Sequence, residues 1–347
     1  MNSRNVIYTG SLLLTLMCAC AMRSTISIPV MKPAAIHLSG VQKLAIADFQ
    51  GVNHSGGQVA ADVQAMLLET RRFDILEREK LSSVLDEQKL GMAGIVDEAT
   101  ARKVGQLLGV DAMIFGDVSA YRVEPDERGV EKVEKKVGTG RYEEVDEKNI
   151  FTGKTKRVKR EIMKTVLVDQ YYRIRRGSVS INFRVVDVET GKLLAVHSDT
   201  KSYDSGKVVD GGNETLRPEG EILTELSNAI CRRFVEFIAP HVVNEARFIE
   251  PGRGSIQVGK KYAQSGLWPE ALETWKQSVV EFPNDPTAFY NLGLAYEVQG
   301  DLDEAENQYK TAVSLKQKRL YLDAINRVRQ ARIESERLKE QLQERQP

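Results

Sequence analysis

Short apolar runs alternate with helical apolar patterns over the first third of this chain. The run at 44–47, followed by Phe49, is typical of a strand that is covered on both faces. Apolar residues then recur at helical spacing, and further strand-like runs separate the helical patterns. The expected elements are strands at 44–49, 73–76 and 112–115 and helices at 59–67, 81–85 and 97–108. Strand and helix in alternation predict a sheet with helices packed against it.

A period of two begins at residue 178. Apolar Val179, Ile181 and Phe183 alternate with polar neighbours, which predicts a strand with one exposed face. The residues at 189–192 form a turn signal, and the chain returns as a partner strand to Thr200, so a β-hairpin is expected. A helix over 218–240 then closes the domain.

The segment 121–177 between these parts is dense in charges of both signs. Its first part is acidic, as at 143–147, and its second part is basic, as at 154–160. Opposite charges on facing arms would support a long β-hairpin through cross-strand pairs. The alternative is a disordered charged loop. We favour the hairpin because valines recur through both arms.

The carboxyl-terminal part contains an internal repeat, with one copy at 252–283 and the next at 286–317. In the second copy the matching positions are Phe289, Leu292, Gly293, Tyr296, Ala305, Tyr309 and Ala312, and the equivalent positions of the first copy are Ser255, Val258, Gly259, Tyr262, Ala271, Trp275 and Ser278. This spacing resembles the tetratricopeptide (TPR) repeat. Gly293 and Ala305 would let two antiparallel helices approach closely, and Gly266 and Gly300 would turn the chain between helices.

Two such repeats with a capping helix would form a short groove. Its inward positions are expected at Ile256, Lys260 and Ala263 and at Tyr290, Leu294 and Glu297. The functional interpretation is a TPR groove that binds envelope or secreted proteins. The alternative is a rigid appendage that packs on a neighbouring domain or subunit.

The amino terminus has the pattern of an export signal. Arg4 precedes an apolar run at 6–17, which is too short for a stable transmembrane helix. Cys20 after Ala19 resembles the lipobox of bacterial lipoproteins, in which cleavage precedes a cysteine that then carries the lipid. Cys18 is a poorer match, and a plain cleaved signal is the alternative. No Asp follows Cys20, so the resemblance implies sorting to the outer membrane, facing the periplasm.

These patterns divide the chain into five parts. They are a signal peptide at 1–19, a lipidated tether at 20–41, an α+β domain at 42–247 with the hairpin inserted at 121–177, two repeats at 252–317, and a capping helix with a charged tail at 318–347. A fully extended tether of about 20 residues would span roughly 65 Å.

The net charge limits the classes of partner that the protein can bind, and the cysteine content limits its disulfides. The formal net charge is zero, with 49 basic and 49 acidic residues, which argues against blanket attraction to nucleic acid or anionic lipid. After cleavage before Cys20 only Cys231 would keep a free thiol, so no intramolecular disulfide is expected. Cys231 lies among apolar residues at helical spacing and is expected to be a buried small hydrophobe.

Catalytic motifs are absent from the sequence. Its four histidines are scattered without metal-ligand spacing, and no glycine-rich phosphate loop is present. Asp48 and Asp187 stand near strand ends, where carboxylates usually form turns. We therefore expect a non-enzymatic protein with no catalytic residue, no metal site and no cofactor.

Four stretches in order, at 44–49, 72–78, 108–112 and 183–194, resemble the CsgG family, the lipoproteins of curli production and secretion. The resemblance implies an α+β fold like an anticodon-binding domain, here with a mixed sheet, packed helices and a long charged hairpin, followed by an all-α TPR domain. It also implies a role in assembly or transport at the cell envelope.

In the secretion channels of this family, two segments become membrane hairpins of an oligomeric pore. They correspond to 121–177 and to the stretch after Thr200, which are charged and polar here. Each lipid-facing charge at mid-depth would cost roughly 2 to 4 kcal/mol, unless every charge faced the lumen. We therefore expect a periplasmic assembly or scaffold lipoprotein. A subunit of an oligomeric curli-type secretion channel is the alternative, and homo-oligomer formation stays open.

Overall fold

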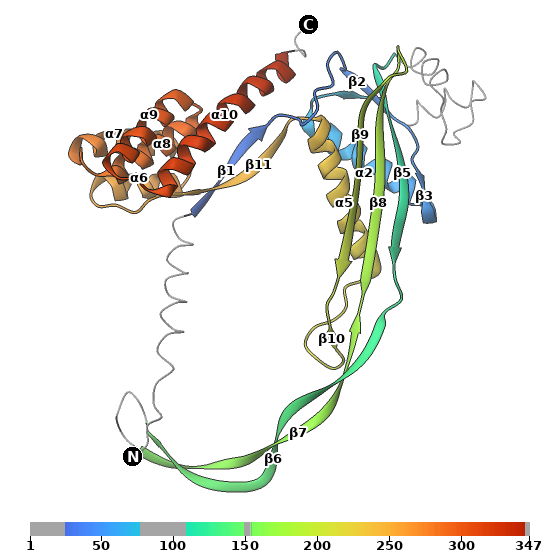
Figure 1. The fold of residues 1–347 in the computed structure, drawn as a ribbon, viewed down its shortest axis with the longest axis vertical. Helices are drawn as coiled ribbons and strands as arrows, with labels where there is room; N and C mark the ends of the chain where they lie inside the picture. Colours follow the sequence, from blue (N-terminus) through green and yellow to red (C-terminus); the bar gives the residue numbers. More distant parts are fainter. Residues whose placement is uncertain (1–24, 77–108, 149–152, 154, 344–347) are drawn as a thin grey trace. The chain divides into compact units, whose positions relative to one another are not determined.

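The computed structural model describes residues 25–76, 109–148, 153 and 155–343, which form two compact units (Figure 1). The helical unit contains residues 25–42, 70–73 and 236–343, and the sheet unit contains 43–69 and 74–235 in their described parts. Cys20, the signal segment and the helices expected at 81–85 and 97–108 lie outside the described residues.

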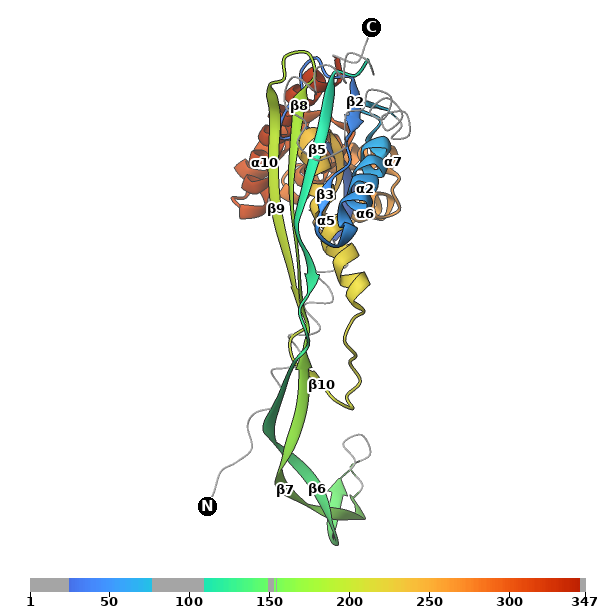
Figure 2. The same ribbon diagram turned by 90° about the vertical axis from the view of Figure 1, so that its right-hand side faces the viewer.

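A mixed sheet forms the core of the sheet unit, with β5, β8 and β9 side by side (Figure 2). Its strands are β2 (Lys43–Ile46), β3 (Gln50–Gly51), β4 (Asp74–Ile75), β5 (Ala112–Val123), β8 (Arg176–Asp187) and β9 (Leu193–Asp204). β2 runs parallel to β4 and to β5, and β3 runs parallel to β5, whereas β8 is antiparallel to both β5 and β9. The expected strands and the hairpin near residue 190 are confirmed, and the fold is a mixed α+β fold.

Two helices, α2 (Ser55–Thr70) and α5 (Glu219–Ile238), follow the predicted apolar spacing. Phe234 of α5 stacks on Phe183 of β8 with ring centroids 4.1 Å apart, which joins helix to sheet through two fully buried rings. Cys231 is fully buried on the same helix, and burial raises the pKa of its thiol to about 12. The prediction of a buried cysteine is confirmed.

The charged segment is a long antiparallel ribbon, as predicted, so the alternative of a disordered loop is wrong. β6 (Glu127–Lys148) pairs with β7 (Thr155–Ile174), with a register shift between Gly138 and Tyr142. Short β10 (Val208–Val209) adds to β7 at its base. The ribbon continues from β5 and leads back into β8 (Figure 1).

The prediction of a structureless tether over 20–41 is wrong for the residues that the structure describes. β1 (Thr25–Lys32) pairs antiparallel with β11 (His241–Phe248) along its whole length. Ile26, Ile28 and Val30 alternate with residues that are more exposed, which is a short period of two. The pattern is brief and interrupted by Pro29, and the partner strand lies far along the chain, so local sequence did not reveal it.

The carboxyl-terminal part consists of two antiparallel helix pairs and one long helix (Figure 1). The elements are α6 (Ser255–Gln264), α7 (Trp268–Glu281), α8 (Pro286–Gln299), α9 (Leu302–Leu315) and α10 (Arg319–Gln343). The capping helix is confirmed, and the charged tail that was expected to follow it is part of the same helix as far as Gln343. Gln341 holds it in place, since its side-chain amide accepts from the N–H of Ala34 at 2.8 Å and donates to the carbonyl of Ala34 at 3.1 Å.

The glycines of the repeat allow close helix packing and end a helix, as their spacing predicts. A Cβ on Gly259 would lie 2.4 Å from the ring of Trp275, and a Cβ on Gly293 would lie 2.8 Å from the ring of Tyr309. Gly300 ends α8 with φ of +83°, in the left-handed region that glycine adopts without strain. Each pair therefore packs through the same glycine–aromatic contact, at equivalent positions of the two copies.

Gly293→Ala is expected to lower the free energy of unfolding of the helical unit by about 1–3 kcal/mol, because the fully buried Tyr309 ring cannot retreat. Urea unfolding followed by tryptophan fluorescence measures this directly, since both tryptophans of the chain, Trp268 and Trp275, lie in α7. Gln277→Ala is the control, because Gln277 is exposed on α7 of the same unit. Equal stability of the two variants would contradict the predicted contact.

Candidate partner-binding site on the inner face of the helices

The residues expected to line a partner groove lie on α6 and α8, and their side chains are buried. Exposed fractions are 0% for Ile256 and Leu294, 1% for Tyr290, 3% for Ala263 and 8% for Lys260, and 5% for the side chain of Glu297. The structure therefore brings these residues together on one face, where the chain itself covers them. That they bind a partner protein stays a prediction.

An extended stretch of the same chain, residues 247–250, occupies this inner face. The hydroxyl of Tyr290 donates to the carbonyl of Phe248 at 2.9 Å. The side-chain amide of Asn291 donates to the carbonyl of Glu250 at 2.8 Å and accepts from its N–H at 3.0 Å. Both backbone groups of Glu250 are thus satisfied by one side chain.

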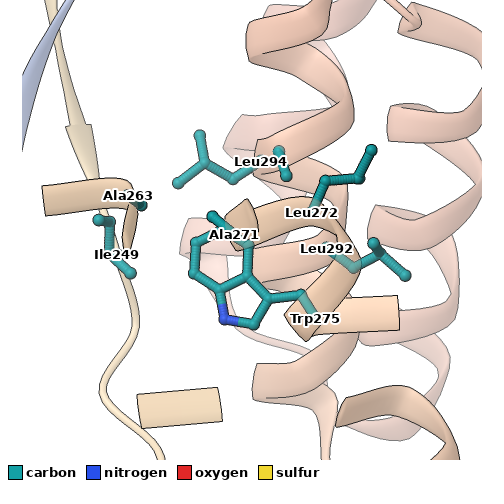
Figure 3. Packing of buried hydrophobic residues seen from close by; sticks show 8 residues of the cluster. Ile249, Ala263, Ala271, Leu272, Trp275, Leu292 and Leu294 are labelled. Carbon is teal, nitrogen blue, oxygen red and sulfur yellow. The ribbon is translucent and has the colours of Figure 1, made fainter. Parts of the chain in front are cut away.

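Between these two clamps the side chain of Ile249 enters the apolar core (Figure 3). It is fully buried in a cluster with Ala263 of α6, Leu294 of α8 and Trp275 of α7. The indole Nε1 of Trp275 donates to the carbonyl of Ile256 at 3.1 Å, so the ring is held in place at the base of the cluster. The inner face thus holds an extended segment by backbone clamps on either side of a buried apolar side chain.

Glu297 is the centre of a charged network on the same face. Arg327 of α10 donates to both of its carboxylate oxygens at 2.7 Å, and Arg247 of β11 donates to Oε1 at 2.9 Å. The hydroxyl of Tyr309 donates to Oε2 at 2.7 Å. Charge-assisted bonds of this kind are the strong ones, so one carboxylate joins β11, α8, α9 and α10.

The protonation of these groups follows from burial and from their partners. Burial alone would raise the pKa of Glu297, but hydrogen bonds from Arg327 and Tyr309 and the charges of Arg327 and Arg247 outweigh it, and hold the pKa of this carboxyl below its usual value. Burial raises the pKa of Tyr290 and Tyr309. Both hydroxyls therefore remain donors.

A second chain of charges ties β1 to the helices. Lys32 lies 2.7 Å from Glu245 of β11 and 2.8 Å from Glu334 of α10. Burial alone would lower the pKa of Lys32. Hydrogen bonds to the two carboxylates outweigh this effect and hold the pKa above its usual value. Arg247 also bonds to Glu245, which connects this chain to the Glu297 network.

Sequence reasoning missed Asn291, Arg247 and Arg327. Asn291 carried a usable signal, because a polar amide inside the apolar run 288–295 of a helix is disfavoured unless it has a buried partner. Arg247 and Arg327 carried none, since charged residues are common in strand ends and in exposed helices. Their role depends on contacts that are distant in sequence.

The charged ribbon is the second surface of interest, and its register places charges on both faces. Glu131 and Lys135 lie on one face, and Lys132, Glu134 and Lys136 lie on the other, because side chains alternate along a strand. The second face also carries the exposed apolar residues Val130, Met163, Leu167 and Tyr171, which are 51–67% exposed. Neither face is a continuous apolar band.

Ion pairs connect the acidic and basic arms near the ribbon tip. Arg157 lies 3.3 Å from Asp146, its cross-strand partner, and 3.8 Å from Glu144, and Arg160 lies 3.5 Å from Glu147. These side chains are 56–70% exposed, so each pair contributes little stability. They do give the basic run internal partners, as expected.

In residues 25–76, 109–148 and 155–343 no group of three or more His, Cys, Asp or Glu side chains is placed to hold a metal ion. Asp187 accepts from the N–H of Thr190 at 2.6 Å and from its hydroxyl at 2.7 Å, which confirms its role in the turn. None of the described helices is both long and apolar enough to cross a membrane.

Comparison with known proteins gives a family match over more than half of the chain. The family described as the curli production assembly/transport component CsgG matches residues 39–245. A domain of unknown function, DUF6340, matches residues 257–343, so the TPR assignment stays a prediction. No functionally curated protein matches the chain.

Several solved structures are similar at low identity. The lipoprotein GNA1162 from Neisseria meningitidis is 14% identical, with 56% of this chain and 97% of that chain covered and a TM-score of 0.32. The PelC dodecamer from Paraburkholderia phytofirmans is 9% identical, with 62% and 98% covered and a TM-score of 0.28. The C-terminal domain of LpoB from Salmonella enterica is 9% identical, with 47% and 86% covered and a TM-score of 0.27.

Proposed function

The chain belongs to the CsgG family, and from this premise we propose that it is an outer-membrane lipoprotein that faces the periplasm. It acts as a non-enzymatic assembly, transport or scaffold component that binds envelope or secreted proteins through its helical unit. The family match supports the assembly or transport role. The signal pattern that ends at Cys20 supports the lipid anchor.

The observation that carries the proposal is the register of the β6–β7 ribbon. Because Lys132 and Lys135 fall on opposite faces, no orientation of the ribbon turns every charge away from lipid. Each lipid-facing charge at mid-depth costs roughly 2–4 kcal/mol. This supports a ribbon that stays in water and is extended for contact with other proteins.

Partner binding at the inner face of the helices is the second part of the proposal. Ile256, Lys260, Tyr290, Leu294 and Glu297 would serve a partner that displaces residues 247–250 from this face. An extended partner segment would need a carbonyl opposite Tyr290 and an apolar side chain in place of Ile249. We expect the partner segment to make the same contacts that residues 247–250 make in this chain.

A channel subunit is the second candidate, and one observation favours it. Apart from β10 at its base, no described strand pairs with the outer edges of β6 and β7. A two-stranded ribbon is marginally stable alone, and the acidic arm of one copy would complement the basic arm of a neighbour. Homo-oligomers formed through these edges would be the first step toward a pore.

Conductance in planar bilayers separates the two candidates. The purified full-length lipoprotein is expected to give no discrete channel events, whereas discrete voltage-stable events would overturn the scaffold proposal. The control replaces residues 139–162 by a two-residue Asn-Gly turn, so that Gly138 and Met163 flank the turn and the pairs from Glu127 to Gly138 keep their partners. Channel events that persist in this control would come from a contaminant. The wild-type measurement would then be repeated after the contaminant had been removed.

A further inference from the structure

The outer face of α6 carries apolar side chains that no other described helix of the helical unit covers. Val258 is 46% exposed, whereas Leu292, its equivalent in the second copy, is 3% exposed. Tyr262 is 37% exposed, whereas its equivalent Tyr296 is partly buried against two clusters. The two copies of the repeat therefore differ on one face.

The difference has a clear cause in the stacking of the helices. In the second copy α7 covers this face, because Leu272, Trp275 and Val279 belong to the cluster that contains Leu292. The Nζ of Lys276 also lies 5.9 Å from the ring centroid of Tyr296. No described helix precedes α6 in the stack, so α6 lacks the neighbour that α8 has.

Packing inside the first pair is nevertheless complete. Gly259 meets Trp275 as Gly293 meets Tyr309, and Ile256 on the inner face is fully buried. The exposed side chains of α6 are thus not a sign of a loosely packed helix. They form an ordered apolar face that lacks the neighbouring helix which covers its equivalent in the second copy.

The charge of α6 indicates the kind of partner that its outer face would bind. α6 contains Lys260 and Lys261 and no acidic residue, and Lys261 is exposed. A second copy that docked on this face about a two-fold axis would bring Lys261 near its own equivalent. An acidic helix that docked on this face would instead be attracted electrostatically by Lys261.

We propose that the outer face of α6, formed by Val258 and Tyr262, binds an acidic amphipathic helix of a partner protein, as α7 binds α8. The helix would present apolar residues at the spacing of Leu272, Trp275 and Val279. This inference rests on the proposed scaffold function and names the class of partner. It concerns a different face from the one that residues 247–250 fill.

The probe is a fluorescein-labelled peptide with the sequence of residues 267–283 of this chain. It carries three glutamates and one lysine, and it has the face that fits α8. Fluorescence anisotropy against the full-length protein is expected to show saturable binding. A peptide with Ser in place of Leu272, Trp275 and Val279 is expected to bind at least tenfold more weakly.

Variants of the protein locate the binding face. Val258→Asp and Tyr262→Asp are each expected to weaken binding at least tenfold, because they put an acid opposite an acidic helix. Val280→Asp is the matched control, since Val280 is 81% exposed on α7 and outside the proposed face. Unchanged tryptophan fluorescence and circular dichroism establish that each variant is folded.

Three results would overturn the proposal. One is the absence of saturable binding, or binding that Val258→Asp leaves unchanged. Another is a concentration-dependent dimer in sedimentation velocity that Val258→Asp abolishes, which would assign the face to a second copy. The third is flotation of the Cys20→Ala protein with phosphatidylethanolamine–phosphatidylglycerol vesicles that Val258→Asp abolishes, which would assign it to a membrane surface. None of these results depends on channel conductance, so failure here is distinct from failure of the scaffold function.

Discussion

Glu297→Gln is expected to lower the free energy of unfolding of the helical unit by about 3–5 kcal/mol, the usual cost of breaking a buried charge pair from one side. Glutamine keeps the volume of the side chain and one oxygen acceptor. It removes the charge that Arg247 and Arg327 face, with those side chains only 8% and 27% exposed. Two guanidinium groups would then be held against a neutral amide.

Urea unfolding with tryptophan fluorescence gives the measurement, because Trp268 and Trp275 report on this unit alone. Glu336→Gln is the matched control, since Glu336 lies on an exposed position of α10. The control is expected to stay within about 0.5 kcal/mol of the wild type, as surface substitutions usually do. A Glu297→Gln protein as stable as the control would show that the network contributes no net stability.

The same carboxylate predicts a pH dependence. The pKa of Glu297 in the folded protein lies below its ordinary value of 4.5. Its ionised form therefore stabilises the fold at and above pH 4.5, and this contribution is lost as the pH falls through the lowered pKa. Wild-type stability should drop on acidification below pH 4.5, and Glu297→Gln should lack this part of the drop. Parallel pH curves for the two proteins would contradict the assignment.

Elements with a strong local period could be predicted from the sequence. The ribbon at 127–174 follows from opposite charges on two arms that share valines, and the cross-strand pair of Asp146 and Arg157 is a direct result. The helix pairs follow from the internal repeat, in which Gly259 and Gly293 are required by the aromatic rings beside them. In these cases the neighbours that decide the structure are near in sequence or repeat regularly.

Elements that depend on distant partners could not be predicted. β1 forms a strand because it pairs with β11. The end of α10 is stabilised by hydrogen bonds between the side chain of Gln341 and the backbone of Ala34. The inner-face positions were recognised from the repeat, but the segment that fills them, residues 247–250, resembles an ordinary linker. Whether a groove is open depends on which chain segment lies in it, and periodicity does not contain that information.

The position of β1 changes how far the fold can stand from its anchor. Between Cys20 and Thr25 the chain advances only a few residues, which span at most about 17 Å when fully extended. The sequence-based expectation was roughly 65 Å, because it assumed an unfolded tether to residue 41. If Cys20 carries the lipid, the helical unit begins close to the membrane surface, and not at the end of a long tether.

Cys20→Ala is expected to release nearly all of the protein from the membrane fraction into the soluble periplasmic fraction. Acyl chains contribute about 0.8 kcal/mol per buried CH₂, so loss of the lipid removes the proposed anchor. Incorporation of labelled palmitate together with cell fractionation measures both steps, and Cys18→Ala is the matched control that should keep its lipid. A Cys20→Ala protein that still needs detergent for extraction would place the ribbon or another segment in the membrane, and would favour the channel. With so short a span before β1, release by this single change would also mean that the helical unit is held at the membrane surface by its lipid alone.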